Sequence, residues 1–139
     1  MEKESVRFRH EYALQVRWGD MDAYGHVNNT LFFRYLECAR FAYFEEVCGF
    51  EAKSMPMVVV VDLQCHFQAQ LHYPAEVVVK SAVVRLGNSS FDLCAEVWAH
   101  GRCCATSKAV MVWMDATSKR PMRIPAPALA MIRDYEGIE

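Results

Sequence analysis

The densest group of chemically capable side chains lies in the run DMDAYGHVNN, residues 20–29. Two carboxylates, Asp20 and Asp22, are followed by His26, and the residues after them have the character of a helix start. Free N–H groups at a helix N-terminus can stabilise an oxyanion that develops on a carbonyl. A carboxylate facing such a site can attack the carbonyl or take a proton from an attacking water. The run therefore indicates acyl-transfer chemistry.

Asp22 is the stronger of the two acidic candidates because it stands nearer the predicted helix. An extended backbone would point Asp20 and Asp22 the same way, whereas a turn would separate them, and the sequence leaves both open. A structural role is the competing interpretation, since Asp20, Asn28 and Asn29 are common turn and capping residues. His26 can equally be an ordinary loop histidine.

Gly25 lets the chain turn with a positive φ and approach a ligand closely. Tyr24, beside it, is open to a second interpretation as a side chain that packs beneath the helix.

Hydrophobic periodicity predicts the elements that position this run. From Tyr12 to Trp18 alternate residues are apolar, which indicates a half-buried strand. Apolar residues at helical spacing then predict a long helix that begins at Asn28 or Asn29 and ends at Gly49. A narrow polar stripe on this helix indicates burial over most of its circumference. Four more strands are expected, at 58–67, 75–86, 91–100 and 103–114. The tail from Pro121 carries Pro125 and Pro127 ahead of ALAMIRDY, which predicts a short terminal helix.

This order of elements predicts an α+β fold in which an antiparallel meander wraps around one long central helix. The length of 139 residues fits a single domain over residues 1–139. One sheet of this size covers only part of the helix, so we expect a homodimer or a dimer of dimers. Glu45 and Glu46 lie near the negative end of the helix dipole and should be unfavourable there unless they are paired.

Composition excludes several functional classes. A net charge of −2 gives no general attraction to nucleic acid. The longest apolar run, 55–61, is far shorter than the ~20 residues of a membrane-spanning helix. The opening MEKESVRFRHEY is charged throughout and is unlike a secretory signal, so we expect a cytoplasmic protein. The six cysteines lie mostly in apolar segments and are interpreted as core thiols, and Cys103 and Cys104 are poorly spaced for a metal site.

The run VRWGDMDAYGHVNNTLFFRYLECAR, residues 16–40, resembles the signature of the 4-hydroxybenzoyl-CoA thioesterase-like family of hotdog proteins. The segments LHYPAEVVV and RLGNSSFDL resemble that family as well. The resemblance implies that Asp22 is the catalytic carboxylate, as nucleophile or general base, and that a backbone N–H near Asn29 polarises the thioester carbonyl. It also implies an active site at a homodimer interface, with Tyr24 and Gly25 close to the substrate.

The same resemblance places residues of the 85–90 turn, Arg85, Ser89 and Ser90, against the nucleotide or pantetheine part of coenzyme A. No metal or redox cofactor is implied, and coenzyme A is part of the substrate. Arg85 and Arg102 also fit a simpler role as solvated charges, although an arginine can clamp a phosphate.

Plant-type acyl-carrier-protein thioesterases resemble the same block through an Asp-x-Asn-x-His arrangement that aligns with Asp22, Tyr24 and His26. This chain has tyrosine where the asparagine is expected, which leaves His26 as the candidate helper. The sequence thus predicts hydrolysis of an acyl-CoA. The alternatives are an acyl-carrier-protein thioesterase, a hydroxyacyl dehydratase, which the motif disfavours, and a non-catalytic acyl-CoA-binding domain.

An acyl pocket is expected near the valine run 58–61 and the aromatic side chains of the helix, for which core packing is the competing role. These aromatic side chains are Phe32, Phe33 and Tyr35.

Overall fold

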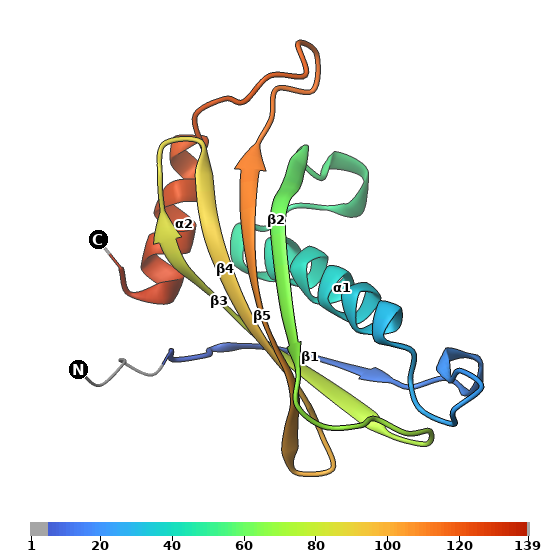
Figure 1. Ribbon diagram of the computed structural model, residues 1–139. Helices are drawn as coiled ribbons and strands as arrows, with labels where there is room; N and C mark the ends of the chain where they lie inside the picture. The colour runs from blue at the N-terminus through green and yellow to red at the C-terminus, as the bar shows by residue number, and fades with distance from the viewer. Residues whose placement is uncertain (1–5, 139) are drawn as a thin grey trace.

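The computed structural model describes residues 6–138, so residues 1–5 of the charged N-terminal segment lie outside it. The described residues form one antiparallel five-stranded sheet, with a long helix α1 against one face and a shorter helix α2 at one end (Figure 1). The elements are β1 (His10–Gln15), α1 (Asn29–Cys48), β2 (Val58–Phe67), β3 (Glu76–Leu86), β4 (Ser90–Ala99), β5 (Arg102–Trp113) and α2 (Ala126–Glu136). Two single-turn 3-10 helices, η1 (Trp18–Asp20) and η2 (Ala52–Ser54), flank α1. The predicted α+β class is confirmed.

Helix α1 begins and ends at the predicted signals. Asn28 is the N-cap, and its Oδ1 accepts a hydrogen bond from the Thr30 N–H at 3.0 Å. Gly49 ends the helix in the left-handed conformation, with φ of 73°, which a glycine adopts without strain. Local sequence chemistry therefore decides both ends of α1.

The side chains on the inner face of the sheet become larger from the N-terminus of α1 to its C-terminus. Near the helix N-terminus it carries small side chains, including Ala95, Ala99 and Ala105, in the same buried cluster as Phe32 and Leu36 of the helix. Near the C-terminus it carries Phe91 and Trp113, which meet Phe44 edge to face. Helix α2 covers the end of the core near the C-terminus of α1 with apolar side chains that include the fully buried Ile132.

The strand order is β1-β3-β4-β5-β2, so the predicted simple meander is correct only for β3, β4 and β5. Strand β2 does not pair with β3, its neighbour in sequence. It pairs with β5 instead, from Val58 opposite Trp113 to Phe67 opposite Ala105. Residues 68–75 carry the chain from β2 at one edge to β3 in the interior, and β1 forms the other edge.

Strand β1 is shorter than predicted and is displaced towards the N-terminus. The prediction of a strand to Trp18 is wrong, because the strand ends at Gln15 and Trp18 lies in η1 with 74% of its surface exposed. The physical reason is a side-chain contact: the carboxylate of Asp20 accepts a hydrogen bond from the Arg17 N–H at 3.0 Å and turns the chain.

Several side-chain expectations are also answered. Glu46 avoids the unfavourable helix dipole by pairing with the buried ring of His10, whose Nε2 lies 2.6 Å from the carboxylate. All six cysteines lie in the described range and none is in a disulfide. Cys48 and Cys104 are buried, and burial raises the pKa of the Cys48 thiol to about 11, which suits an inert core thiol. Neither helix in residues 6–138 has the length and apolar content needed to cross a membrane.

The C-terminal end of α2 is tied to the sheet by a half-buried carboxylate. Glu136 Oε2 accepts hydrogen bonds from the Val83 N–H, which lies beside the bulge in β3, and from the Tyr43 hydroxyl at 3.2 Å. Burial raises the pKa of Glu136 above its usual range, although these hydrogen bonds act in the opposite direction.

This raised pKa predicts a pH-dependent contribution to stability. The folded state holds the Glu136 proton more tightly than the unfolded chain, so the contribution is fully present below the ordinary carboxyl pKa of about 4.3. It is lost as the pH rises through the raised folded value. Glu136→Gln keeps an acceptor oxygen and cannot ionise. We expect the melting temperature of the wild type to fall relative to Glu136→Gln as the pH rises above about 4.3. A difference between the two proteins that stays constant across thermal melts from acid to neutral pH would contradict this.

Candidate active site

The candidate residues between β1 and α1 form a tight hairpin. Met21 and Val27 are bridged as antiparallel partners, and the Asp22 N–H donates to the His26 carbonyl at 2.8 Å. The Gly25 N–H donates back to the Asp22 carbonyl at 3.0 Å, and Gly25 has a φ of 79°. The hairpin thus places residues 22–26 directly before the first turn of α1.

The structure separates the two acids and gives Asp20 a structural role. Asp20 is 3% exposed, and its Oδ2 accepts from the Tyr35 hydroxyl at 2.7 Å and from the Arg17 N–H. The Arg17 Nε lies 3.5 Å from its Oδ1. A carboxylate so fully bonded is held as an acceptor and is not free to act on a substrate.

Asp22 is less constrained. Its side chain is partly exposed, and Oδ1 accepts a hydrogen bond from the Tyr24 N–H at 2.9 Å. Within residues 6–138 this is the only hydrogen bond to its carboxylate, so Oδ2 keeps its lone pairs. A carboxylate oriented by one backbone donor and otherwise unpaired suits a nucleophile or a general base.

A cleft of about 290 Å³ opens at the N-terminus of α1. One wall comes from the hairpin and the helix, through His26, Asn29 and Phe32, and the other comes from Phe67 at the end of β2 and residues 68–71 that follow it. The walls are joined by a hydrogen bond of 2.7 Å from the Val27 N–H to the Leu71 carbonyl. Asn29 is the first residue of α1, where the helix itself supplies no acceptor for the backbone N–H. The cleft therefore combines an apolar wall with a polar helix tip.

The remaining members of the predicted hairpin group lie beside this cleft. Asp22, Tyr24 and Gly25 are not among the residues that line it, although they belong to the same hairpin as His26. Tyr24 is 86% exposed, so the interpretation that it packs beneath the helix is wrong. The reason is the turn itself, which directs this side chain to solvent.

His72 was not identified from the sequence. Its Nδ1 lies 3.2 Å from the Gly25 carbonyl, and its ring contacts the ring of His26 edge to face, with the centroids 4.6 Å apart. Nothing in the sequence pattern joins residue 72 to residue 26, because the long crossover from β2 to β3 brings them together. The resemblance in the LHYPAEVVV segment was the one available signal, and it carried no chemical role.

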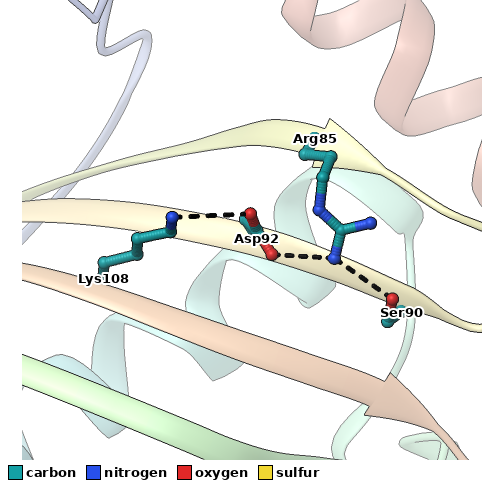
Figure 2. A network of polar contacts seen from close by, with 4 residues as sticks. All are labelled: Arg85, Ser90, Asp92 and Lys108. Atoms are coloured by element: carbon teal, nitrogen blue, oxygen red, sulfur yellow. Dashed lines mark hydrogen bonds and ion pairs between the residues drawn. The ribbon is translucent and has the colours of Figure 1, made fainter.

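The predicted nucleotide-contacting residues lie on the outer face of the sheet. Figure 2 shows Arg85 between Ser90 and Asp92, with Lys108 on the other carboxylate oxygen of Asp92. The Arg85 Nη2 donates to Asp92 Oδ1 at 2.8 Å and to the Ser90 hydroxyl at 3.1 Å. The hydrogen bond from Arg85, together with Lys108, lowers the pKa of Asp92. Arg85 is therefore already paired within its own sheet.

These residues are far from the hairpin in a single chain. Strand β3 starts at Glu76 opposite Gln15, near the hairpin, and reaches Arg85 at its other end. At roughly 3.3 Å per residue, these two positions on β3 are about 30 Å apart. Figure 1 shows the same separation: the turn between β3 and β4 lies near α2, and the loop after β1 lies near the start of α1. One chain does not bring Arg85, Ser89 and Ser90 to the cleft that His26 lines.

The predicted acyl-pocket residues divide between roles. Phe32 lines the cleft, whereas Tyr35 is a core residue bonded to Asp20. Val58 to Val60 line a second cavity of about 250 Å³ farther along α1, and Phe33 lines neither cavity but a separate hollow with Val60 and Leu63. No group of three or more side chains suited to hold a metal ion occurs among residues 6–138.

The sequence model of the thioesterase-like superfamily matches residues 16–132, which include the hairpin, α1 and the whole sheet after it. The chain belongs to the thioesterase-like superfamily. Its sheet wrapped around one long helix is the hotdog arrangement of that superfamily, as the resemblance implied.

Solved structures agree with this assignment. A thioesterase of Thermus thermophilus, solved in complex with coenzyme A and Zn, has a TM-score of 0.85 and 30% identity, over 95% of this chain and 97% of that one. The PA2801 protein of Pseudomonas aeruginosa has a TM-score of 0.82 and 35% identity, over 91% and 99% of the two chains. Among curated proteins, the chloroplastic acyl-acyl carrier protein thioesterase ATL3 of Arabidopsis thaliana is 28% identical over 124 residues. That match covers 84% of this chain and 64% of the plant protein.

The hairpin geometry of this superfamily member predicts that Gly25 tolerates no side chain without strain. An added Cβ would meet no atom within 4 Å at Gly25 or at Gly19, but only Gly25 has a positive φ. Gly25→Ala should therefore lower the free energy of unfolding by about 1 kcal/mol through backbone strain alone. Gly19→Ala, the matched control, should change it by less than about 0.5 kcal/mol. Urea denaturation measures both, and equal losses in the two variants would refute this account of the hairpin.

Proposed function

We propose that this protein is an acyl-CoA thioesterase that hydrolyses an acyl thioester to the free acid and coenzyme A, with Asp22 as its catalytic carboxylate. One observation carries the proposal: an otherwise unpaired carboxylate belongs to the same hairpin that forms one wall of a cleft at the N-terminus of α1. The membership in the thioesterase-like superfamily and the coenzyme A bound to the Thermus relative support it.

Each part of this arrangement has a chemical task. The N–H at Asn29 stabilises the oxyanion as the thioester carbonyl becomes tetrahedral, because it has no acceptor within the helix. Asp22 either attacks the carbonyl, which gives an anhydride that water hydrolyses, or removes a proton from the attacking water. Coenzyme A leaves as the thiolate in both routes. In this proposal the protonated ring of His26, which lines the cleft, gives the thiolate its proton and regains one from the water that the reaction consumes. The apolar side chain of Phe32 contacts the acyl group.

A second copy of the chain completes the site in this proposal. Strand β2 is an edge of the described sheet, is ten residues long, and exposes apolar side chains, including 59% of Val61 and 46% of Phe67. An unpaired apolar edge of this length favours pairing with another strand. The partner here is the same strand of a second copy, related by a twofold axis.

The register of β2 explains why such a dimer matters for the site. The Phe67 end of β2 lies at the cleft. At the other end of β2, Val58 and Val59 pair with the end of β5, which in turn pairs with the start of β4 at Ser90. Antiparallel pairing of two β2 strands puts the Val58 end of one copy beside the Phe67 end of the other. The turn that carries Arg85 and Ser90 is then brought towards the cleft of the other copy, where it contacts coenzyme A.

A second candidate function has its own support. The similarity to the plant acyl-acyl carrier protein thioesterase favours a carrier-protein thioester as the substrate. Comparing hydrolysis of the same acyl group on coenzyme A and on acyl carrier protein separates the two. A non-catalytic acyl-CoA-binding domain would bind an acyl-CoA and release no thiol.

Asp22→Asn tests the catalytic assignment. Loss of the essential base or nucleophile should reduce thiol release from a panel of acyl-CoAs at least ~100-fold, measured with a thiol-reactive dye. Asp134→Asn, on the exposed side of α2, is the control and should retain full activity. Asp20→Asn should act mainly on folding, because it disturbs the buried acceptor of Tyr35. Unchanged turnover in Asp22→Asn would remove this residue from the mechanism.

Val61→Lys tests the dimer. Val61 and Val84 are both exposed valines at strand bulges, but Val61 lies on the edge strand β2 and Val84 on the interior strand β3. A lysine on the edge should oppose strand pairing, so Val61→Lys should shift the mass measured by light scattering from dimer to monomer and lower turnover. Val84→Lys should leave the mass unchanged. A wild type that is monomeric, or a Val61→Lys variant that remains dimeric, would exclude pairing through β2.

A further inference from the structure

The segment that joins β2 to β3 is anchored against the hairpin on both sides of His72. The Leu71 carbonyl accepts from the Val27 N–H at 2.7 Å, and the Ala75 carbonyl accepts from the Val16 N–H at 2.9 Å. These two bonds attach the crossover to the start of α1 and to the end of β1. His72 lies between them, so its backbone is held in place before its side chain makes any contact.

The contact from His72 to the hairpin requires one particular tautomer. Its Nδ1 lies 3.2 Å from the Gly25 carbonyl oxygen, which can only accept a hydrogen bond. The proton must therefore be on Nδ1, and the neutral ring then keeps its lone pair on Nε2.

The same ring also contacts His26, the histidine on the wall of the cleft. The two ring planes meet at 69° with centroids 4.6 Å apart, an edge-to-face arrangement. His72 thus restrains the hairpin at two neighbouring points, the Gly25 carbonyl and the His26 ring. Both belong to the short loop that also carries Asp22.

We propose that His72 is a positioning residue of the active site: its Nδ1–H holds the Gly25 carbonyl and its ring orients His26, so that the hairpin presents Asp22 and His26 to the substrate in one geometry. This inference rests on the proposed thioesterase function and adds a residue to its machinery. The ring of His72 is not itself part of the cleft lining, and it acts through its contacts with His26 and the Gly25 carbonyl.

The exposure of His72 separates this role from a purely structural one. The side chain is exposed, so its removal leaves no cavity and no buried unpaired group. A residue that only stabilised the fold would change the melting temperature. A positioning residue should change kcat while the melting temperature and KM remain close to those of the wild type.

Three substitutions at one position test the inference. His72→Asn keeps an N–H donor at the place of Nδ1, His72→Gln moves the donor one bond farther out, and His72→Ala removes it. We expect kcat for acyl-CoA hydrolysis to fall about 5- to 10-fold in His72→Ala and His72→Gln, the factor of one lost hydrogen bond, with KM within about twofold. His72→Asn should recover most of the loss. His100→Asn, at an exposed histidine in the turn between β4 and β5, is the control and should keep full activity.

Nitrogen-15 NMR of the histidine rings supplies a readout that is independent of turnover. At about pH 8.5, where free imidazole is neutral, His72 should be the Nδ1–H tautomer, and the ring signals of His26 should move in His72→Ala and not in His100→Asn. An Nε2–H tautomer, or equal kcat in all His72 variants, would overturn the inference. A loss of kcat that follows the melting temperature would also overturn it. A wild type that releases no thiol refutes the proposed function itself, a result seen without any His72 variant.

Discussion

The buried carboxylate of Asp20 is the contact on which the site depends. It accepts from the Tyr35 hydroxyl on the second turn of α1 and from the Arg17 N–H after β1, while the Asp20 carbonyl accepts from the Asn28 N–H at 3.0 Å. A buried carboxylate is costly unless it is well hydrogen-bonded, so these donors are required by the fold. Together these hydrogen bonds fix the end of β1 against the start of α1. Residues 21–27 must connect two points that are already held together, and they form a short hairpin.

This division of labour explains why two acids occur two residues apart. Asp20 holds the frame from inside, and Asp22 lies on the part of the chain that the frame projects towards solvent. The side chain that does the structural work is unavailable for chemistry because its oxygens are occupied. Asp22, the residue proposed for chemistry, is available because its carboxylate accepts only one backbone hydrogen bond within the described residues.

The size of the buried side chains changes along α1, and the two candidate ligand-contacting regions lie at opposite ends of this change. Small inner-face residues pack beside the first half of the helix, while aromatic residues and α2 pack beside its second half. The cleft lies at the N-terminal end of α1, next to β2 at the edge of the described sheet. The Arg85 network lies at the other end, near α2, where the single carboxylate of Asp92 pairs with both Arg85 and Lys108 on the outer face. The two candidate ligand-contacting regions are thus separated within one chain, and the twofold pairing that we propose through β2 would bring them together.

Local sequence by itself determined the elements and the motif that indicated the superfamily, whereas only the tertiary structure decided the long-range pairings. The ends of α1 follow from Asn28 and Gly49, because capping depends on residues one to three positions away. The structure differs from the sequence-based expectation in four places. Strand β2 lies at the far edge of the sheet, β1 ends early, Asp20 has a structural role, and His72 contacts His26. Except for the end of β1, which the local contact between Asp20 and Arg17 sets, each of these outcomes depends on contacts between segments distant in sequence. Periodicity reports which face of a strand is buried, but it does not report which strand lies beside it.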